Sequence, residues 1–155
     1  MTDPFLEEDF RVLTPEAFEF VLTNELKRAL RSQNFVTLVL VEPAFRGVPE
    51  GGNGERARAA REVARLISRD VRETDLISHT SHSRLSLVLL DADFENAIGV
   101  INRLMARLDH YDFPRPLTFE IGAACCPTHG VDAESLRRAA ESRPVRTRGD
   151  HFKAQ

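Results

Sequence analysis

Apolar residues recur along the chain with two different spacings, which divide it into predicted helices and strands. In four segments the apolar positions lie three and four residues apart, the spacing of an amphipathic helix. These segments are residues 14–31, 55–71, 93–108 and 132–141. Thr14 before Pro15, and Asp132 before the last segment, have the side chains expected at a helix N-cap. The pattern therefore predicts four helices.

Four shorter apolar runs have the length and composition of β-strands: residues 35–41, 75–79, 84–90 and 117–125. The first is apolar nearly throughout, as expected for a central strand covered on both faces. Residues 80–83 separate the second run from the third and predict a hairpin. Residues 43–54 are rich in glycine and proline and predict an exposed loop. Helices and strands alternate around one hairpin, which predicts an α/β chain.

The size of the chain, 155 residues, fits one domain with one sizeable core. Its formal net charge of -3 comes from 21 basic and 24 acidic side chains. Such a balance offers no broad positive field to a nucleic-acid backbone, so we expect no nucleic-acid polymer as a partner. No segment has the ~20 consecutive apolar residues of a membrane-spanning helix, so we expect no membrane insertion.

Cysteine and histidine residues offer little chemistry. Cys125 and Cys126 are neighbours in a predicted strand, where side chains alternate between faces and cannot easily form a disulfide bond. Unpaired thiols fit a reducing compartment, so we expect a cytoplasmic location. His79 and His82 flank the predicted turn without a third or fourth ligand nearby, which argues against a zinc site. Residues 51–54 lack the lysine of a phosphate loop.

Several short phrases, taken in order, resemble successive landmarks of the GGDEF domain, the domain of bacterial diguanylate cyclases. They are LTPEAF (13–18), REVAR (61–65), RETDLI (72–77), LVLLDAD (87–93), FEIGA (119–123) and LRRA (136–139). Each phrase alone is common, so the resemblance rests on their order and spacing. It implies an α/β (α+β) palm with a central mixed, mostly antiparallel sheet of about five strands flanked by helices. We expect a flexible segment 1–12, a domain 13–143 and a weakly ordered tail 144–155.

The residues that the resemblance assigns to catalysis are replaced, so we expect a degenerate domain that is not an enzyme. Ser81-His82-Ser83-Arg84-Leu85 stands where active members have the Gly-Gly-Asp/Glu-Glu-Phe turn. Arg84 occupies a position that supplies a carboxylate to magnesium in the family, and a cation repels that ion. At the end of the first strand, Val41 and Pro43 replace two further aspartates. Glu42 is a poor substitute, because neighbouring strand residues point to opposite faces. We expect no magnesium and no other cofactor.

One family site is retained in sequence. Many GGDEF domains bind cyclic di-GMP at an inhibitory site with the core Arg-x-x-Asp, and Arg72-Glu-Thr-Asp75 stands at the matching offset before the turn. Alignment through the following segment adds Arg103. Arginine can bond two atoms of guanine at once, and aspartate can accept from guanine N–H groups. The alternative interpretation is an ordinary Arg72–Asp75 ion pair with Arg103 as one more exposed arginine.

Two functions follow from these features. The first is a non-enzymatic receptor that binds cyclic di-GMP through Arg72, Asp75 and Arg103 and signals to a protein partner. Contact with a second copy is a further expectation, because this ligand can bridge domains. The second is a nucleotide-independent interaction or scaffold module that uses the turn 80–84 or the loop 43–54 as its docking surface.

Overall fold

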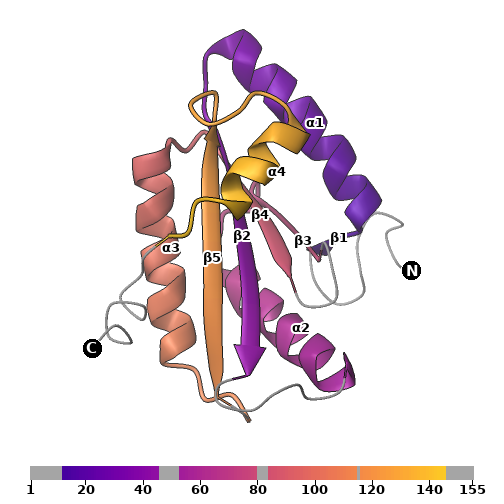
Figure 1. Ribbon diagram of the computed structural model, residues 1–155, viewed down its shortest axis with the longest axis vertical. Helices are drawn as coiled ribbons and strands as arrows, with labels where there is room; N and C mark the ends of the chain where they lie inside the picture. The colour runs from indigo at the N-terminus through magenta and orange to yellow at the C-terminus, as the bar shows by residue number, and fades with distance from the viewer. Residues whose placement is uncertain (1–11, 46–52, 80–83, 115, 146–155) are drawn as a thin grey trace.

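The computed structural model describes residues 12–45, 53–79, 84–114 and 116–145 (Figure 1). The predicted hairpin connection 80–83, which includes His82, lies outside these residues. Nine elements follow one another along the chain, five strands and four helices among the described residues. They are β1 (Val12–Leu13), α1 (Pro15–Ser32), β2 (Val36–Phe45), α2 (Asn53–Asp70), β3 (Leu76–His79), β4 (Leu85–Leu90), α3 (Phe94–Asp109), β5 (Leu117–Cys126) and α4 (Ala133–Glu141).

The five strands form one mixed sheet in the order β1-β3-β4-β2-β5. The β1·β3 pair is parallel, and the other three pairs are antiparallel. This agrees with the mixed, mostly antiparallel sheet that the resemblance implied. Strand β1 was not predicted, because two residues are too short to show a period. It is nonetheless fixed in place: Val12 is buried, and the Ser78 hydroxyl donates to the Leu13 carbonyl oxygen at 2.8 Å.

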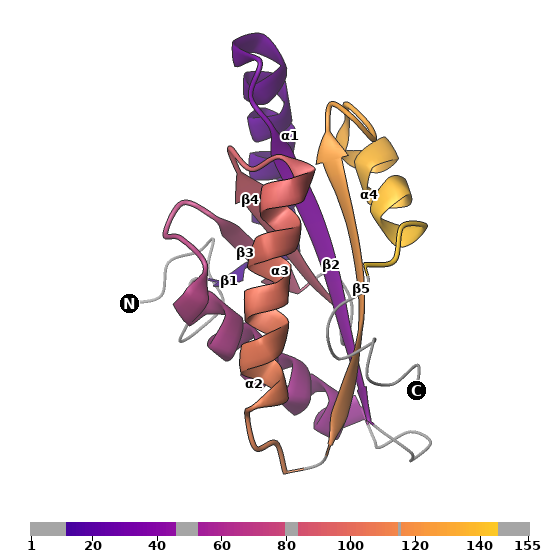
Figure 2. The same ribbon diagram turned by 90° about the vertical axis from the view of Figure 1, so that its left-hand side faces the viewer.

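Helices cover both faces of the sheet, α2 and α3 on one and α1 and α4 on the other (Figure 2). Alternate residues of β2 explain the two layers. Val39 and Val41 pack with the α2–α3 core, while Leu38 and Leu40 pack with the α1–α4 core. A strand buried on both faces has a nearly continuous apolar sequence, and in residues 36–41 only Thr37 is polar. None of the described helices is both long and apolar enough to cross a bilayer.

Two predicted helix starts are confirmed by their capping geometry. The Thr14 side chain accepts from the Ala17 N–H at 3.3 Å, and Pro15 occupies the first turn of α1. Asp132 and Ser135 form a capping box at α4. These side chains satisfy backbone N–H groups that the helix itself leaves without partners.

The predicted loop 43–54 is wrong at both ends. Strand β2 continues to Phe45, so Pro43 lies within a strand, and α2 already begins at Asn53. Beyond Val41, β2 pairs only with β5, because the described β4 partners end at Leu85. Proline is tolerated on such an edge stretch, where one side of the strand carries no ladder. Residues 46–52 lie outside the described part of the chain.

Structure continues past both expected domain boundaries, to Val12 at one end and to Val145 at the other. After α4 the chain turns onto the open edge of β5, where the Val145 N–H donates to the Ile121 carbonyl oxygen at 2.8 Å. Next to this hydrogen bond, Gly122 and Pro144 form an antiparallel β-bridge. A Cβ on Gly122 would overlap the Ala140 carbonyl oxygen, so only glycine lets the end of α4 approach β5 this closely.

The neighbouring thiols of β5 are free, as predicted. Both are buried, and Cys126 packs in the α1–α4 core. Burial raises the pKa of the Cys125 thiol and of the Cys126 thiol, because the charged thiolate is poorly solvated there. A high thiol pKa fits the prediction that neither is a nucleophile.

Candidate functional site

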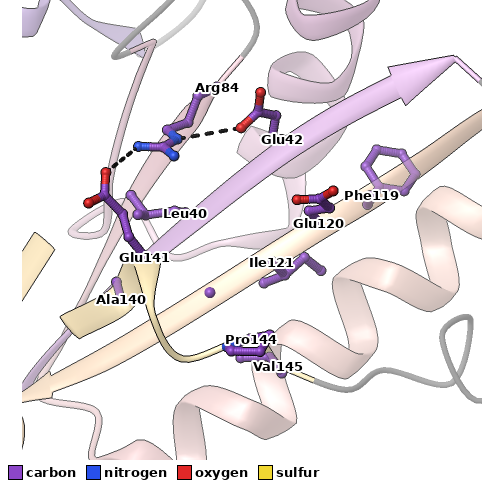
Figure 3. Close-up of a pocket in the computed structure, with 11 residues that line it drawn as sticks. Leu40, Glu42, Arg84, Phe119, Glu120, Ile121, Ala140, Glu141, Pro144 and Val145 are labelled. Carbon is purple, nitrogen blue, oxygen red and sulfur yellow. Dashed lines mark hydrogen bonds and ion pairs between the residues drawn. The ribbon is translucent and has the colours of Figure 1, made fainter. Parts of the chain in front are cut away.

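Arg84, the residue before β4, forms an ion-pair bridge between the sheet and α4 (Figure 3). Its Nε lies 3.7 Å from Glu42 Oε1 and its Nη1 lies 2.9 Å from Glu141 Oε2. The Arg84 side chain is only 29 % exposed. Its guanidinium is therefore held between a carboxylate of β2 and a carboxylate at the end of α4.

This bridge closes one side of a pocket of about 250 Å³ between β2, β5 and the end of α4. Leu40 and Ile121 are among its apolar walls, and Glu42, Glu120 and Glu141 supply the acidic groups. Glu42 and Glu120 are directly opposite each other in the β2·β5 register. Like charges in that position repel each other, so Arg84 offsets part of a local excess of negative charge.

Val41 and Pro43 are both buried. Val41 packs in the α2–α3 core and pairs with Leu85 and Ile121, whereas Glu42 is partly exposed and pairs with Arg84. Glu42 therefore points to the opposite face of β2 from Val41, as the alternation of strand side chains predicted. Among the described residues, no group of three or more His, Cys, Asp or Glu side chains is arranged to hold a metal ion.

Asp75 lies in the turn between α2 and β3 and is 5 % exposed. Its Oδ2 accepts from the Arg72 backbone N–H at 3.1 Å, and its Oδ1 accepts from the Leu90 backbone N–H at 3.1 Å. The carboxylate thus fixes the turn and joins it to the end of β4. The sequence predicted that Asp75 accepts directly from a ligand. In the structure both of its carboxylate oxygens accept hydrogen bonds from backbone N–H groups.

Arg72 is brought together with Asp75, as the sequence predicted. Its Nη2 lies 3.5 Å from Asp75 Oδ1 and also donates to the Leu90 carbonyl oxygen. The Arg72 side chain is nevertheless 60 % exposed. One guanidinium nitrogen anchors the side chain while much of the fork remains at the surface.

Arg103 is exposed on α3. It precedes Arg107 by four residues, and residues at this spacing share one face of a helix. Arg107 Nε lies 2.6 Å from Asp70 Oδ2, so this face of α3 is turned toward the end of α2. The structure therefore places Arg103 on the exposed face of α3, the helix that follows β4.

A hollow of about 130 Å³ lies beside the turn that carries Arg72. Thr74, Leu90 and Asp91 line it from the turn and from the end of β4, and Arg28 and Asn34 line it from the end of α1. Asp91 has a φ of 57°, a left-handed conformation that is uncommon outside glycine. The sequence did not indicate this hollow, because its walls come from segments far apart along the chain.

His129 was also missed by the sequence analysis. Its Nδ1 accepts from the Cys125 backbone N–H at 2.8 Å, and its ring packs edge-on against Phe94 with 5.1 Å between centroids. Burial and the nearby Arg143 lower the pKa of His129, since both disfavour the charged ring. His79 lies in β3 and is partly buried. Neither histidine belongs to a metal-binding cluster among the described residues.

Comparison of the sequence with family models and with curated proteins finds no match. Solved structures, in contrast, match over most of the chain. The GGDEF domain of FimX from Pseudomonas aeruginosa is 14% identical, with a TM-score of 0.74 and 91% of each chain covered. A DGC protein from Thermotoga maritima is 18% identical, with a TM-score of 0.72, covering 86% of this chain and 96% of that one.

The GGDEF domain of DgcB from Caulobacter crescentus, solved in complex with c-di-GMP, is 9% identical. Its TM-score is 0.71, and the match covers 92% of this chain and 88% of that one. Identities this low establish the architecture alone. The chain has the fold of GGDEF domains.

Proposed function

We propose that this chain is a non-catalytic GGDEF-fold domain that binds cyclic di-GMP through Arg72 and Arg103 and signals occupancy to a protein partner. The proposal rests on one observation: Arg72 is exposed at the surface but anchored by Asp75 and the Leu90 carbonyl oxygen. An anchored guanidinium loses less side-chain entropy when it binds, and its planar fork matches guanine or phosphate.

Within this proposal Asp75 is a positioning residue. Its oxygens accept from two backbone N–H groups, and the carboxylate is almost fully buried. It therefore acts on the ligand through Arg72, which it holds at the edge of the turn. Arg103 supplies a second cation from α3, and two cations suit a ligand with two phosphates.

The absence of catalysis is part of the same proposal. Val41 and Pro43 have no side-chain oxygen, and Arg84 carries a positive charge, so the positions that hold magnesium in the family do not fit this ion. Phosphoryl transfer depends on metal ions and positioned cations that stabilise spread negative charge. Arg84 is paired with Glu42 and Glu141, which leaves it poorly placed to stabilise a phosphate.

The occurrence of the ligand on this fold gives further support. The DgcB domain from Caulobacter crescentus was solved with c-di-GMP, and another matching structure describes an interaction between a microbial GGDEF domain and cyclic di-GMP. These ligands belong to those proteins. They show that the architecture can present surfaces that accept this dinucleotide.

Calorimetric titration with cyclic di-GMP tests the proposal. We expect saturable binding that is weakened in Arg72→Ala and in Arg103→Ala. Arg138→Ala is the matched control, because Arg138 is a 72 % exposed arginine of α4 whose ion pair lies within its own helix. Absence of heat at high micromolar ligand would exclude the receptor. Formation of cyclic dinucleotide from GTP and magnesium would exclude the non-catalytic assignment.

The alternative is a nucleotide-independent interaction module. The acidic pocket at Arg84 favours it, because Glu42, Glu120 and Glu141 leave an excess of negative charge around this arginine. Such a surface suits a partner with a basic side chain. A partner that binds the ligand-free protein, unaffected by Arg72→Ala but weakened by Glu120→Gln, would support this function instead.

A further inference from the structure

We propose that the acidic residues 7–9 dock against a row of arginines on α2 and so lower the affinity of the neighbouring Arg72 for an anionic ligand. The docking does not depend on a ligand, and only its effect at Arg72 rests on the proposed function. The row, the arginine stripe, consists of Arg58, Arg61, Arg65 and Arg69.

The arginine stripe follows the outward face of α2. Its members are three or four residues apart, a spacing that places them on one side of a helix. The opposite side carries Val63, Ala64 and Ile67, which are buried in the α2–α3 core. Three members of the stripe are exposed: Arg58, Arg61 and Arg69. The helix therefore turns a row of guanidinium groups away from the sheet.

The acids of α2 leave an excess of positive charge on this helix. Glu62 Oε1 accepts from Arg65 Nε at 2.9 Å, within the stripe. Asp70 pairs with an arginine of α3, and Glu55 is in the first turn. Since α2 has five arginines and three acids, it is basic, although the chain as a whole has a formal net charge of -3.

Residues on either side of α2, including those outside the described part of the chain, do not reverse this excess. Residues 46–52, which precede the helix, add one arginine and one glutamate, and residue 115 is a further arginine. The turn that follows α2 adds Arg72 and Glu73, one charge of each sign. The arginine stripe therefore suits an acidic occupant.

Residues 1–11 lie outside the described part of the chain, but the point at which they join it is fixed. Val12 pairs with Ile77 in the β1·β3 ladder, five residues beyond Arg72. Val12 also belongs to the same core cluster as Ile67 and Val71, near the end of α2 (Figure 2). The N-terminal segment thus joins the sheet beside the C-terminal half of α2.

This segment has the charge and the length that the arginine stripe requires. Residues 1–11 contain four acids and one base, and three of the acids are consecutive at positions 7–9. An extended chain spans at most about 3.5 Å per residue, so Asp9 can lie about 10 Å from the start of β1 and Glu7 about 17 Å. Arg61 and Arg69 are about 12 Å apart along the helix axis. The acidic residues are therefore long enough to follow the C-terminal half of the stripe.

The short linker to β1 strengthens this contact. An exposed carboxylate–guanidinium pair contributes little by itself, but tethered groups meet at a high effective concentration. Negative charge on the stripe lies close to Arg72, the next arginine along the chain, and opposes an anionic ligand there. A ligand bound at Arg72 would in turn displace residues 7–9, and the released segment gives a partner a signal of occupancy.

Spin labelling tests the docking without any ligand. We would attach a nitroxide to Thr2→Cys in the full chain, whose two native cysteines are buried. We expect paramagnetic broadening of NMR signals from α2 that is stronger than in α4, which lies on the other face of the sheet (Figure 2). The broadening should decrease at high salt, which screens exposed charges.

Neutral variants of the labelled protein identify both sides of the contact. Glu7→Gln, Glu8→Gln and Asp9→Asn combined should remove most of the broadening in α2, and so should Arg61→Gln combined with Arg69→Gln. The matched control removes three exposed acids of other helices and should leave the broadening unchanged: Glu16→Gln, Glu95→Gln and Glu134→Gln. Circular dichroism checks the fold of each variant.

Equal broadening of α2 and α4, or broadening of α2 that persists in both neutral variants, would overturn the docking. A different occupant would overturn it as well: α2 signals that respond to phosphatidylserine vesicles but not to the spin label would assign the arginine stripe to an anionic membrane surface.

Calorimetry separates this inference from the proposed function. The variant with neutral residues 7–9 should bind cyclic di-GMP about fivefold more tightly than the parent, because the parent is largely in the docked state. Equal affinity would overturn the effect at Arg72. Absence of binding by both proteins would overturn the proposed function and that effect, whereas the spin-label result would still decide the docking.

Discussion

Two arginines, Arg72 and Arg84, have opposite situations in this fold. Arg84 lies between Glu42 and Glu141 and is 29 % exposed, whereas Arg72 has one buried carboxylate partner and is 60 % exposed. The first guanidinium is used within the molecule, and the second is positioned but available. The number of carboxylate partners, together with exposure, decides whether an arginine can serve a ligand.

The largest expected effect concerns the carboxylate that holds Arg72. Asp75→Ala removes an acceptor from the backbone N–H groups of Arg72 and Leu90, and buried donors without partners are costly. We expect the free energy of unfolding to fall by about 2–3 kcal/mol, measured by urea denaturation. Asp75→Asn, which keeps one acceptor oxygen, should lose less. Equal stability of the alanine variant and the parent would show that Asp75 does not organise the turn.

A charge-conserving change sharpens the role of Arg72. Arg72→Lys keeps the positive charge but loses the planar fork. We expect affinity for cyclic di-GMP to fall by about tenfold, since a bidentate contact to a base contributes roughly 1–3 kcal/mol. Thermal unfolding checks that the fold is retained. Full affinity in the lysine variant would mean that charge alone, and no guanidinium geometry, holds the ligand.

Removal of the other arginine should have a small effect. Arg84→Ala breaks two partly exposed ion pairs, which contribute less than about 1 kcal/mol each. We expect a slight decrease in the free energy of unfolding and no change in affinity for cyclic di-GMP. A loss of ligand affinity as large as that of Arg72→Ala would remove the distinction between the two regions.

The smallest expected effect is a pH dependence that involves neither arginine. The pKa of His129 is lowered from 6.5 by burial and by Arg143, so the folded protein favours the neutral ring. Its contribution to stability is present above pH 6.5 and is lost as the pH falls below that value toward the lower folded-state pKa. Urea denaturation at several pH values should show a weaker dependence in His129→Gln. An identical pH profile in parent and variant would contradict this role.

Much of the architecture could be predicted from local patterns. Thr14 and Asp132 predicted helix starts because a capping side chain acts on the next few residues. Strand β1 could not be predicted, because it depends on its parallel pairing with β3. Pro43 suggested a loop, but its place in the strand depends on where the β4 ladder ends.

In the candidate sites, too, contacts between residues close in sequence could be predicted, and contacts between distant residues could not. The Arg72–Asp75 contact spans three residues, so the sequence could indicate it. Of the two carboxylates that hold Arg84, Glu141 lies on α4, 57 residues further along, and no local pattern connects the two residues.

The most direct test is a calorimetric comparison of the parent, Arg72→Ala and Arg84→Ala under identical conditions with cyclic di-GMP. The proposed function predicts saturable heat for the parent and for Arg84→Ala, and a binding constant at least about tenfold weaker for Arg72→Ala. No binding by the parent, or equal affinity in all three proteins, would contradict it.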